Sequence, residues 1–339
     1  MKVIIVNNPK QKGAVDGAVA VFRALVDLKP DLNVETQVVN AVAEVSVKPD
    51  VICSVGPDTT DMALEIYNNF SGCIMVGMKD PFKSNPPAVY EKWRFIVDTM
   101  GTMKDSPVYQ ARPDLVYIPP FPPFTLTKKE LEEAGKDPIL EVFRPDIAVV
   151  IGGADPYTGY GITGKDMAVL SYIIDRIDLS YGRNVAFITS PRTPKGVEDD
   201  LKSWTTADSV AVFNIHEKML YVGRNKKVAC ENFYKAALAA ATMIIVTDDS
   251  LSVMAEATVA EKALLIYRTV LTDGYYTGVP ALRRQEVCKN VVEMAGAAVL
   301  DWRITLDGEE PADLMYPKSK SLEGVVDKEI AERLIKAIF

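Results

Sequence analysis

The segment IIVTDDSLSVMAEA, residues 244–257, contains the unit from which the fold of this chain is built. An apolar run of three β-formers is followed by four polar residues, and the apolar residues then recur at helical spacing. A buried strand that ends at a polar turn and continues into a helix is the repeating unit of α/β proteins with parallel sheets. This segment therefore predicts an α/β fold.

The same pattern recurs in the N-terminal part of the chain. Apolar runs typical of buried strands alternate there with helical patterns. The predicted strands are residues 3–6, 34–39, 51–55, 73–76, 95–97 and 115–118, and the predicted helices include 13–27 and 60–69. Continuous Val and Ile runs joined by helices indicate a parallel sheet that is covered on both faces.

A proline-rich segment then interrupts the pattern. Pro119–Phe124 cannot form a central strand, because proline has no N–H to donate. Its two phenylalanines could dock a partner or a lipid, or the segment could be a rigid linker that packs on its own domain. A short amphipathic helix is predicted at Lys128–Ala134, and residues 126–144 are predicted to link two domains.

The pattern restarts near residue 145. The predicted strands are 147–151, 184–188, 209–213, 243–246 and 263–267, and the predicted helices are 165–178, 197–204, 231–241, 251–259 and 329–338. We therefore predict two doubly wound, Rossmann-type domains, residues 1–125 and 145–325, with a cleft between them.

Composition restricts the class of function. With 339 residues the chain is long enough for two domains, and its formal net charge of −8 disfavours general nucleic-acid binding. The pairs Lys226-Lys227 and Arg283-Arg284 are interpreted as solvated surface. The four cysteines form no metal-binding pattern, so we expect no metal site and a reducing, cytoplasmic location. No run is long and apolar enough to predict a membrane span, and the short N-terminal apolar run does not predict a signal peptide.

Two strand-end motifs are candidates for binding a phosphate or a ribose. Ile151 is followed by Gly152 and Gly153, which suit either a close backbone approach to a ligand or a plain tight turn. The second motif, Ser190-Pro191-Arg192-Thr193-Pro194, places an arginine after a strand, where its planar fork could bind phosphate. Thr193 and Pro194 could equally cap a helix beside a solvated arginine.

The opening segment adds a third motif. The helix start at Asp249, Ser250 and Ser252 could receive a phosphate, although Asp249 or Ser250 could instead cap the helix. Glu256 follows about two turns later and could bind two ribose hydroxyls, or it could be an ordinary surface glutamate.

Two residues are candidates for a general base. Asp58 lies in a predicted strand-end loop, where Gly-Pro-Asp is also typical of a turn and helix cap. His216 is the only histidine, and a lone loop histidine can equally be inert.

Together the motifs resemble those of the mitochondrial-fission ("Elongated Mitochondria One") family, whose bacterial members are described as glycosyltransferases. The matching residues are Ile151-Gly152-Gly153, Ser190–Pro194, Asn232-Phe233-Tyr234 and Thr247–Ala257, all within residues 145–270. The sequence departs from the family pattern at Pro191, which replaces the first arginine of an Arg-Arg pair, and at Ala255, which replaces a serine. The N-terminal half contains no matching motif.

The resemblance implies a GT-B fold and a metal-independent glycosyltransferase. The C-terminal domain would bind a nucleotide-sugar donor, and the N-terminal domain an unidentified acceptor: a glycan, a lipid or a small molecule. The final helix, residues 326–339, would pack back on the N-terminal domain. No cofactor is expected, and the location would be cytoplasmic or peripheral to a membrane. A nucleotide-sugar epimerase or hydrolase of the same fold and a non-enzymatic adaptor are the alternatives.

Overall fold

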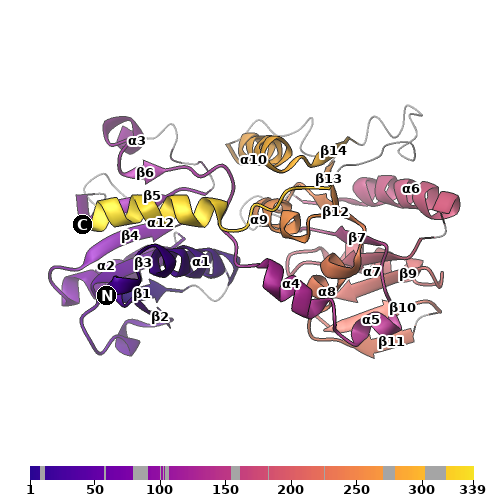
Figure 1. Ribbon diagram of the computed structural model, residues 1–339, viewed down its shortest axis with the longest axis horizontal. Coiled ribbons are helices and arrows are strands. Elements are labelled where there is room, and N and C mark those ends of the chain that lie inside the picture. The colour runs from indigo at the N-terminus through magenta and orange to yellow at the C-terminus, as the bar shows by residue number, and fades with distance from the viewer. Residues whose placement is uncertain are drawn as a thin grey trace. The chain divides into compact units, whose positions relative to one another are not determined.

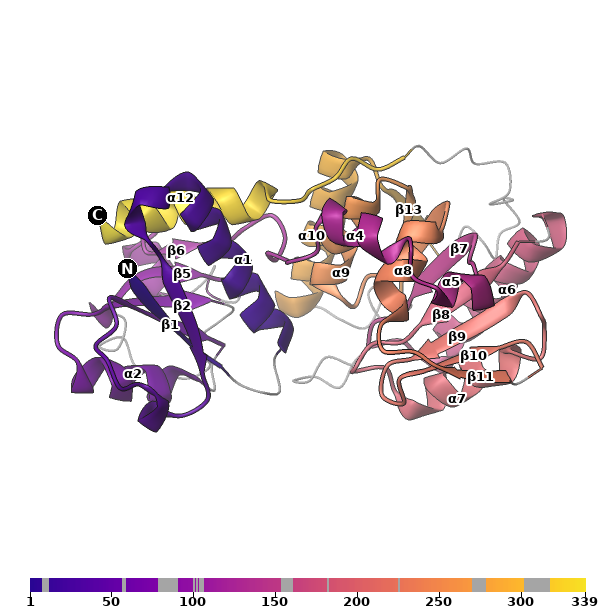
Figure 2. The same ribbon diagram turned by 60° about the horizontal axis from the view of Figure 1, so that its bottom comes forward.

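The computed structural model describes residues 1–339 except 8–11, 57–58, 79–90, 100, 102, 104–106, 154–160, 182, 225, 270–278 and 302–317. The chain divides into two compact units. Unit 1 comprises Met1–Thr125 and Gly324–Phe339, and unit 2 comprises Leu126–Glu323. Each unit is a sheet with helices packed on it (Figures 1 and 2).

Unit 1 contains a six-stranded sheet in the order β2-β1-β3-β4-β5-β6, and its strand pairs are parallel. The strands are β1 (Lys2–Val6), β2 (Glu35–Val39), β3 (Val51–Val55), β4 (Ile74–Met78), β5 (Trp93–Val97) and β6 (Val116–Tyr117). The helices are α1 (Lys12–Leu28), α2 (Thr60–Asn69), α3 (Pro107–Ala111) and α12 (Val325–Ile338).

Helices cover both faces of the unit 1 sheet. Side chains alternate between the two faces of a strand, so each buried strand supplies apolar groups to both. On one face Ala63 and Ile66 of α2 join a cluster with Ile4, Ile52 and Ile96. On the other face α12 packs along α1 and contacts β5 (Figures 1 and 2). The last helix of the chain is therefore part of unit 1.

Unit 2 contains an eight-stranded sheet in the order β11-β10-β9-β8-β7-β12-β13-β14. The strands are β7 (Ile147–Val150), β8 (Val185–Ile188), β9 (Val210–Asn214), β10 (Met219–Val222), β11 (Lys226–Ala229), β12 (Met243–Thr247), β13 (Ala263–Arg268) and β14 (Ala298–Asp301). From β9 to β14 the pairs are parallel, in the Rossmann order 3-2-1-4-5-6. The sequence did not predict the antiparallel hairpin β10–β11, which extends this sheet.

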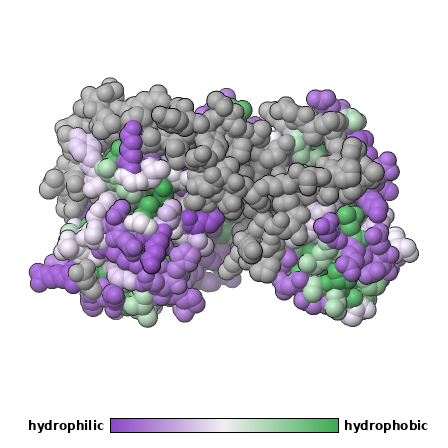
Figure 3. All heavy atoms as spheres, turned by 180° about the vertical axis from the view of Figure 1, so that it is seen from behind, coloured by the Kyte–Doolittle hydropathy of each residue, from purple (hydrophilic) through white to green (hydrophobic). Residues whose placement is uncertain are grey.

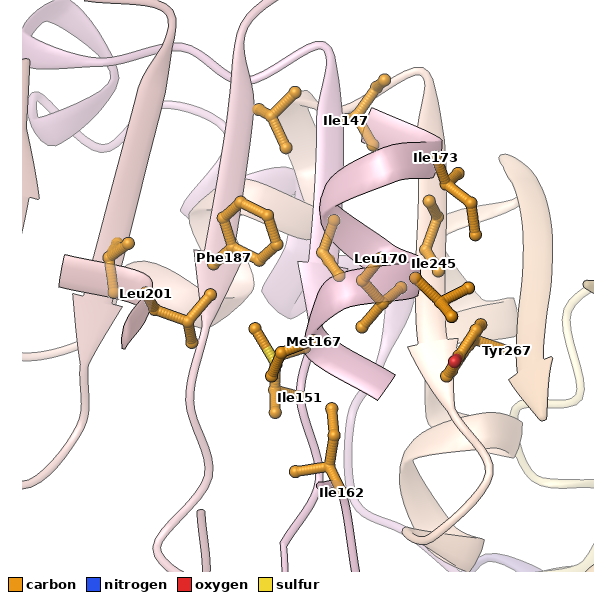
Figure 4. Packing of buried hydrophobic residues seen from close by; sticks show 14 of the residues in the cluster. Ile147, Ile151, Ile162, Met167, Leu170, Ile173, Phe187, Leu201, Ile245 and Tyr267 are labelled. Atoms are coloured by element: carbon orange, nitrogen blue, oxygen red, sulfur yellow. The ribbon is translucent and has the colours of Figure 1, made fainter. Parts of the chain in front are cut away.

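The helices of unit 2 also lie on both faces of the sheet. They are α4 (Lys128–Ala134), α5 (Ile139–Val142), α6 (Gly164–Tyr181), α7 (Lys195–Trp204), α8 (Phe233–Ala240), α9 (Leu251–Glu256) and α10 (Val279–Ala295). Met167, Leu170 and Ile173 of α6 point at strand residues that include Ile245 and Tyr267 (Figure 4). On the other face Phe233 of α8 packs 6.1 Å from Phe213 between ring centres. Hydrophilic and hydrophobic residues are interspersed on the described surface that Figure 3 shows.

The segment predicted as a linker is folded into unit 2. Residues 126–144 contain α4 and α5, and both helices pack against α8. Thr127 and Glu130 form a capping box at the start of α4, which explains why so short a helix is stable there. The idea that Phe121 and Phe124 are exposed for docking is wrong, because both side chains are buried.

Candidate functional site

Three of the predicted motifs lie side by side at one edge of the unit 2 sheet. β7 lies between β8 and β12, and the strand order reverses at this point. Open sheets of this kind bind ligands outside the carboxyl ends of the strands at such a reversal. Gly152, Arg192 and Asp249 follow the three strands, so parallel pairing brings these predicted site residues to the same edge.

Gly152 is held between the two neighbouring strand ends. Its N–H donates to Oγ1 of Thr247 over 2.7 Å, and its carbonyl accepts from Oγ1 of Thr193, also over 2.7 Å. A Cβ atom at Gly152 would lie 2.6 Å from Cγ of Asp249, a contact that real Cβ atoms essentially never make. The missing side chain therefore lets the Asp249 carboxylate lie directly against β7.

A side chain at position 153 would also collide with a neighbouring loop. A Cβ atom there would lie 2.5 Å from Cβ of Arg192 and would collide with the main chain of the same residue. The sequence left a ligand contact and a plain turn as alternatives for Gly152 and Gly153. In the structure each glycine makes room for a neighbouring loop, so no ligand is needed to account for either residue.

The motif after β8 forms a compact turn. The N–H of Ser190 donates to Oγ1 of Thr193 over 2.8 Å, and the N–H of Arg192 donates to Oγ of Ser190 over 3.3 Å. The alternative in which Thr193 caps a helix is not found, because Pro194 occupies the cap position of α7 and no side chain caps this helix. Thr193 is buried and bonds to Gly152 instead, whereas the Arg192 side chain is exposed.

Asp249 is the buried acid of this edge. Its side chain is 3% exposed, and its Oδ1 accepts a hydrogen bond from the Thr247 hydroxyl over 2.5 Å. Burial raises the pKa of Asp249, and the Thr247 hydrogen bond with the charges of Arg284 and Arg192 offsets part of that rise. The sequence placed Thr247 in the polar turn and in the family motif but did not indicate its hydrogen bonds to Gly152 and Asp249.

Arg284 was also missed. The pair Arg283-Arg284 was interpreted as solvated surface, and this is wrong, since the two residues are 2% and 8% exposed. Both belong to α10, and Arg283 forms a 3.0 Å ion pair with Glu286. Only the packing of α10 on α9 shows that this part of the helix is buried.

The helix after β12 is shorter than predicted. α9 ends at Glu256, and a 3-10 turn, Ala257–Ala260, replaces its predicted continuation to Val259. Ser250 is the cap residue but makes no side-chain cap hydrogen bond, and Ser252 is half-buried. A helix of six residues has a weak terminal dipole, so the helix start alone gives little attraction for phosphate.

Glu256 lies beside a residue from another motif. Tyr234 belongs to Asn232-Phe233-Tyr234, at the start of α8, and burial together with the charge of Glu256 raises its pKa well above the ordinary value. Glu256 itself is half-buried. The structure thus brings the motif Asn232-Phe233-Tyr234 next to the motif Thr247–Ala257. Their spacing in the sequence alone did not indicate this contact.

The two candidate bases fall in different situations. Asp58 lies outside the described residues. His216 lies in the turn between β9 and β10, with a half-exposed side chain whose Nε2 is 3.9 Å from Oε1 of the buried Glu198. Oδ1 of Asn214 accepts hydrogen bonds from the N–H groups of His216 and Glu217 and so fixes this turn.

Neither a metal cluster nor a membrane span is found where the structure is described. No group of three or more His, Cys, Asp or Glu side chains in these residues could hold a metal ion. None of the helices within the described ranges is long and apolar enough to cross a membrane.

Comparison with known proteins identifies the family. The family model described as mitochondrial fission ELM1 matches residues 116–301, which is more than half of the chain. The chain belongs to the mitochondrial fission ELM1 family. The matched range holds the three strand-end motifs and the Tyr234–Glu256 pair. No curated protein matches this ELM1-family chain.

Solved structures share its fold. The UDP-GlcNAc 2-epimerase from Methanocaldococcus jannaschii is 13% identical, with a TM-score of 0.55 over 99% of each chain. A complex of the same enzyme with UDP-GlcNAc and UDP is also 13% identical, with a TM-score of 0.51 over 99% of this chain and 100% of that one. The predicted GT-B-like fold, with two Rossmann-type units, is confirmed. At this identity the likeness establishes the fold alone.

Proposed function

We propose that unit 2 binds a nucleotide-sugar and that the protein transfers the sugar to an acceptor hydroxyl without a metal ion. The observation that carries this proposal is the convergence of the β7, β8 and β12 ends, which buried hydrogen bonds join at the strand-order reversal. Groups held in place before the ligand arrives lose little freedom when it binds. Such an edge suits a ligand that several protein groups bind simultaneously.

Two residues have complementary roles in donor binding. Arg192 is exposed next to Gly153, and its guanidinium would make parallel hydrogen bonds to the diphosphate and stabilise the charge of the leaving group. Glu256 would accept the ribose hydroxyls, with Tyr234 beside it. Ser190, Ser250 and Ser252 supply further hydroxyls at the same strand ends.

The proton of the acceptor hydroxyl needs a base. Asp58 and His216 are the proposed candidates. The ring of His216 faces a carboxylate, since its Nε2 is 3.9 Å from Oε1 of Glu198. The acceptor is proposed to be a glycan, a lipid or a small molecule.

Nucleotide binding tests the proposal first. Thermal shift with UDP, GDP, CMP and ADP, then with their sugar conjugates, should give a selective stabilisation of about 2.7 kcal/mol at a hundred times the Kd. Arg192→Ala and Glu256→Ala should abolish that shift. Arg224→Ala and Glu231→Ala are matched controls, because both residues are exposed in unit 2, and these variants should keep it.

Each outcome bears on the proposal. No shift with any nucleotide, from a protein with an intact melting transition, would overturn donor binding and favour a non-enzymatic adaptor. When a donor binds, product analysis separates the reactions: transfer requires an acceptor, whereas a hydrolase or an epimerase consumes or converts the donor alone.

A further inference from the structure

The two carboxylate oxygens of Asp249 differ in their hydrogen bonding. Oδ1 accepts the hydrogen bond from Thr247, whereas Oδ2 is buried and has no hydrogen-bond partner in the described parts of the chain. Buried carboxylate oxygens are nearly always hydrogen-bonded in folded proteins. An unpaired oxygen in a side chain that is 3% exposed therefore points to a ligand that brings a donor.

The position of this oxygen identifies the site. A Cβ atom placed on Gly152 would lie 2.8 Å from Oδ2, so the free oxygen lies against the end of β7. Asp249 itself follows β12. The unpaired acceptor is therefore at the reversal point of the strand order, where sheets of this topology receive their ligands.

The chemistry of this position disfavours phosphate. The N–H of Gly152, which a phosphate would need, already donates to Thr247, and its carbonyl already accepts from Thr193. An ionised carboxylate beside them would repel a phosphate oxygen. Two cations, the buried Arg284 and the exposed Arg192, act on Asp249. Arg192 is the exposed one and lies on the adjoining loop after β8, so the phosphate is assigned to the β8 side of the edge.

We infer that Asp249 accepts a hydrogen bond from a hydroxyl of the donor sugar and thereby distinguishes a nucleotide-sugar from the bare nucleoside diphosphate. The inference rests on the proposed function, because it assigns the two parts of the proposed nucleotide-sugar to two different strand ends. Arg192 at the end of β8 binds the diphosphate, and Asp249 at the end of β12 binds the sugar. Thr247 holds the Asp249 carboxylate in the orientation that this requires.

The variant Asp249→Asn tests the inference, because asparagine keeps the shape and the oxygen that accepts from Thr247 but replaces the free acceptor with a donor. The Kd values are measured by calorimetry for matched pairs: UDP with UDP-glucose, GDP with GDP-glucose, and ADP with ADP-glucose. The variant should weaken binding of the glucose conjugate at least about tenfold, as expected for a hydrogen bond to a charged group. The Kd of the diphosphate should stay the same or fall, since a negative charge has been removed.

The control is Asp248→Asn, which changes the neighbouring buried carboxylate that accepts from Thr269. It should leave the ratio of the two Kd values unchanged. Equal weakening of diphosphate and conjugate by Asp249→Asn, or weakening of neither, would overturn the inference while leaving donor binding intact. If the wild-type protein binds no diphosphate and no conjugate, both the proposed function and this inference are wrong.

Discussion

The buried side-chain hydrogen bonds at the strand ends of unit 2 run across the sheet, whereas those described after β3 of unit 1 stay within one loop. In unit 2 the bond from Gly152 to Thr247 connects residues 95 apart, and that from Thr193 to Gly152 connects residues 41 apart. In unit 1 the hydroxyls of Ser54 and Thr59 lie 2.8 Å apart and are only five residues apart in the chain. Both sets of side chains are largely buried, so burial alone does not distinguish the two edges.

The difference lies in how far apart the bonded residues are in the chain. Local hydrogen bonds shape one loop, but long-range bonds fix several loops relative to one another, as a preorganised binding site requires. The family match at residues 116–301 begins near the end of the unit 1 sheet and covers most of unit 2. The cross-linked edge therefore lies in the part of the chain that the family shares.

The largest effect is expected when an added methyl group crowds the cross-linked edge of unit 2. Gly153→Ala should destabilise the protein by about 3 kcal/mol, because the new Cβ meets the main chain of Arg192, which cannot rotate away. The matched glycine in unit 1 is Gly17 of α1, whose Cβ would lie 3.1 Å from Pro123. There the helix propensity of alanine, about 1 kcal/mol better than glycine, offsets the crowding. Urea unfolding followed by far-UV circular dichroism measures both changes, and equal losses would contradict the comparison.

A smaller effect is expected when one hydroxyl is removed from each edge. Thr193→Val and Thr59→Val should each lower the free energy of unfolding by about 1–2 kcal/mol, because each leaves a buried carbonyl without the hydroxyl that donates to it. Only Thr193→Val should weaken nucleotide binding, since it releases the β8 loop from Gly152. Denaturation and calorimetry on the same two variants give the result. A comparable loss of affinity in Thr59→Val would show that general destabilisation, and not the cross-link, controls binding.

The smallest effect is on pH dependence and has opposite signs in the two units. Asp249 has a raised pKa through burial, so its stabilising contribution is present below its unfolded pKa and is lost as pH rises through the folded value. Asp114 of unit 1 has a pKa lowered by its hydrogen bond with Arg112, so its contribution is present above its unfolded pKa and is lost as pH falls.

Between about pH 4 and about pH 7, Asp249→Asn should therefore gain stability relative to wild type, and Asp114→Asn should lose it. Urea unfolding at the two pH values tests the signs. The same sign in both variants would mean that the two carboxyls do not differ in environment as described.

Most of the framework could be predicted from local patterns. Continuous apolar runs such as Val51–Val55 and Ile147–Val150 are strands with both faces buried, and the sequence of such runs with intervening helices is enough to predict parallel sheets. The hairpin β10–β11 was missed. Its strands are short, and it turns at Gly223 and Arg224, where Arg224 has a φ of 54° that local propensity would not favour.

The site was predictable only in part. The types of its residues were visible, because glycines, an arginine and acids after buried strands stand out against apolar runs. Their contacts were not visible. Nothing in the pattern shows that Asp249 lies against Gly152, or that Tyr234 lies beside Glu256, because these residues are far apart in the chain.

The sequence by itself determined the α/β class, the two-part organisation and the strand ends that carry polar chemistry, because these depend on periodicity and on residue type. Only the tertiary structure decided that residues 126–144 pack on α8, that Arg283 and Arg284 are buried, and that both site glycines make room for neighbouring loops. Burial and hydrogen bonding are properties of segments brought together by strand pairing. That pairing joins residues many tens of positions apart, beyond the reach of any local pattern.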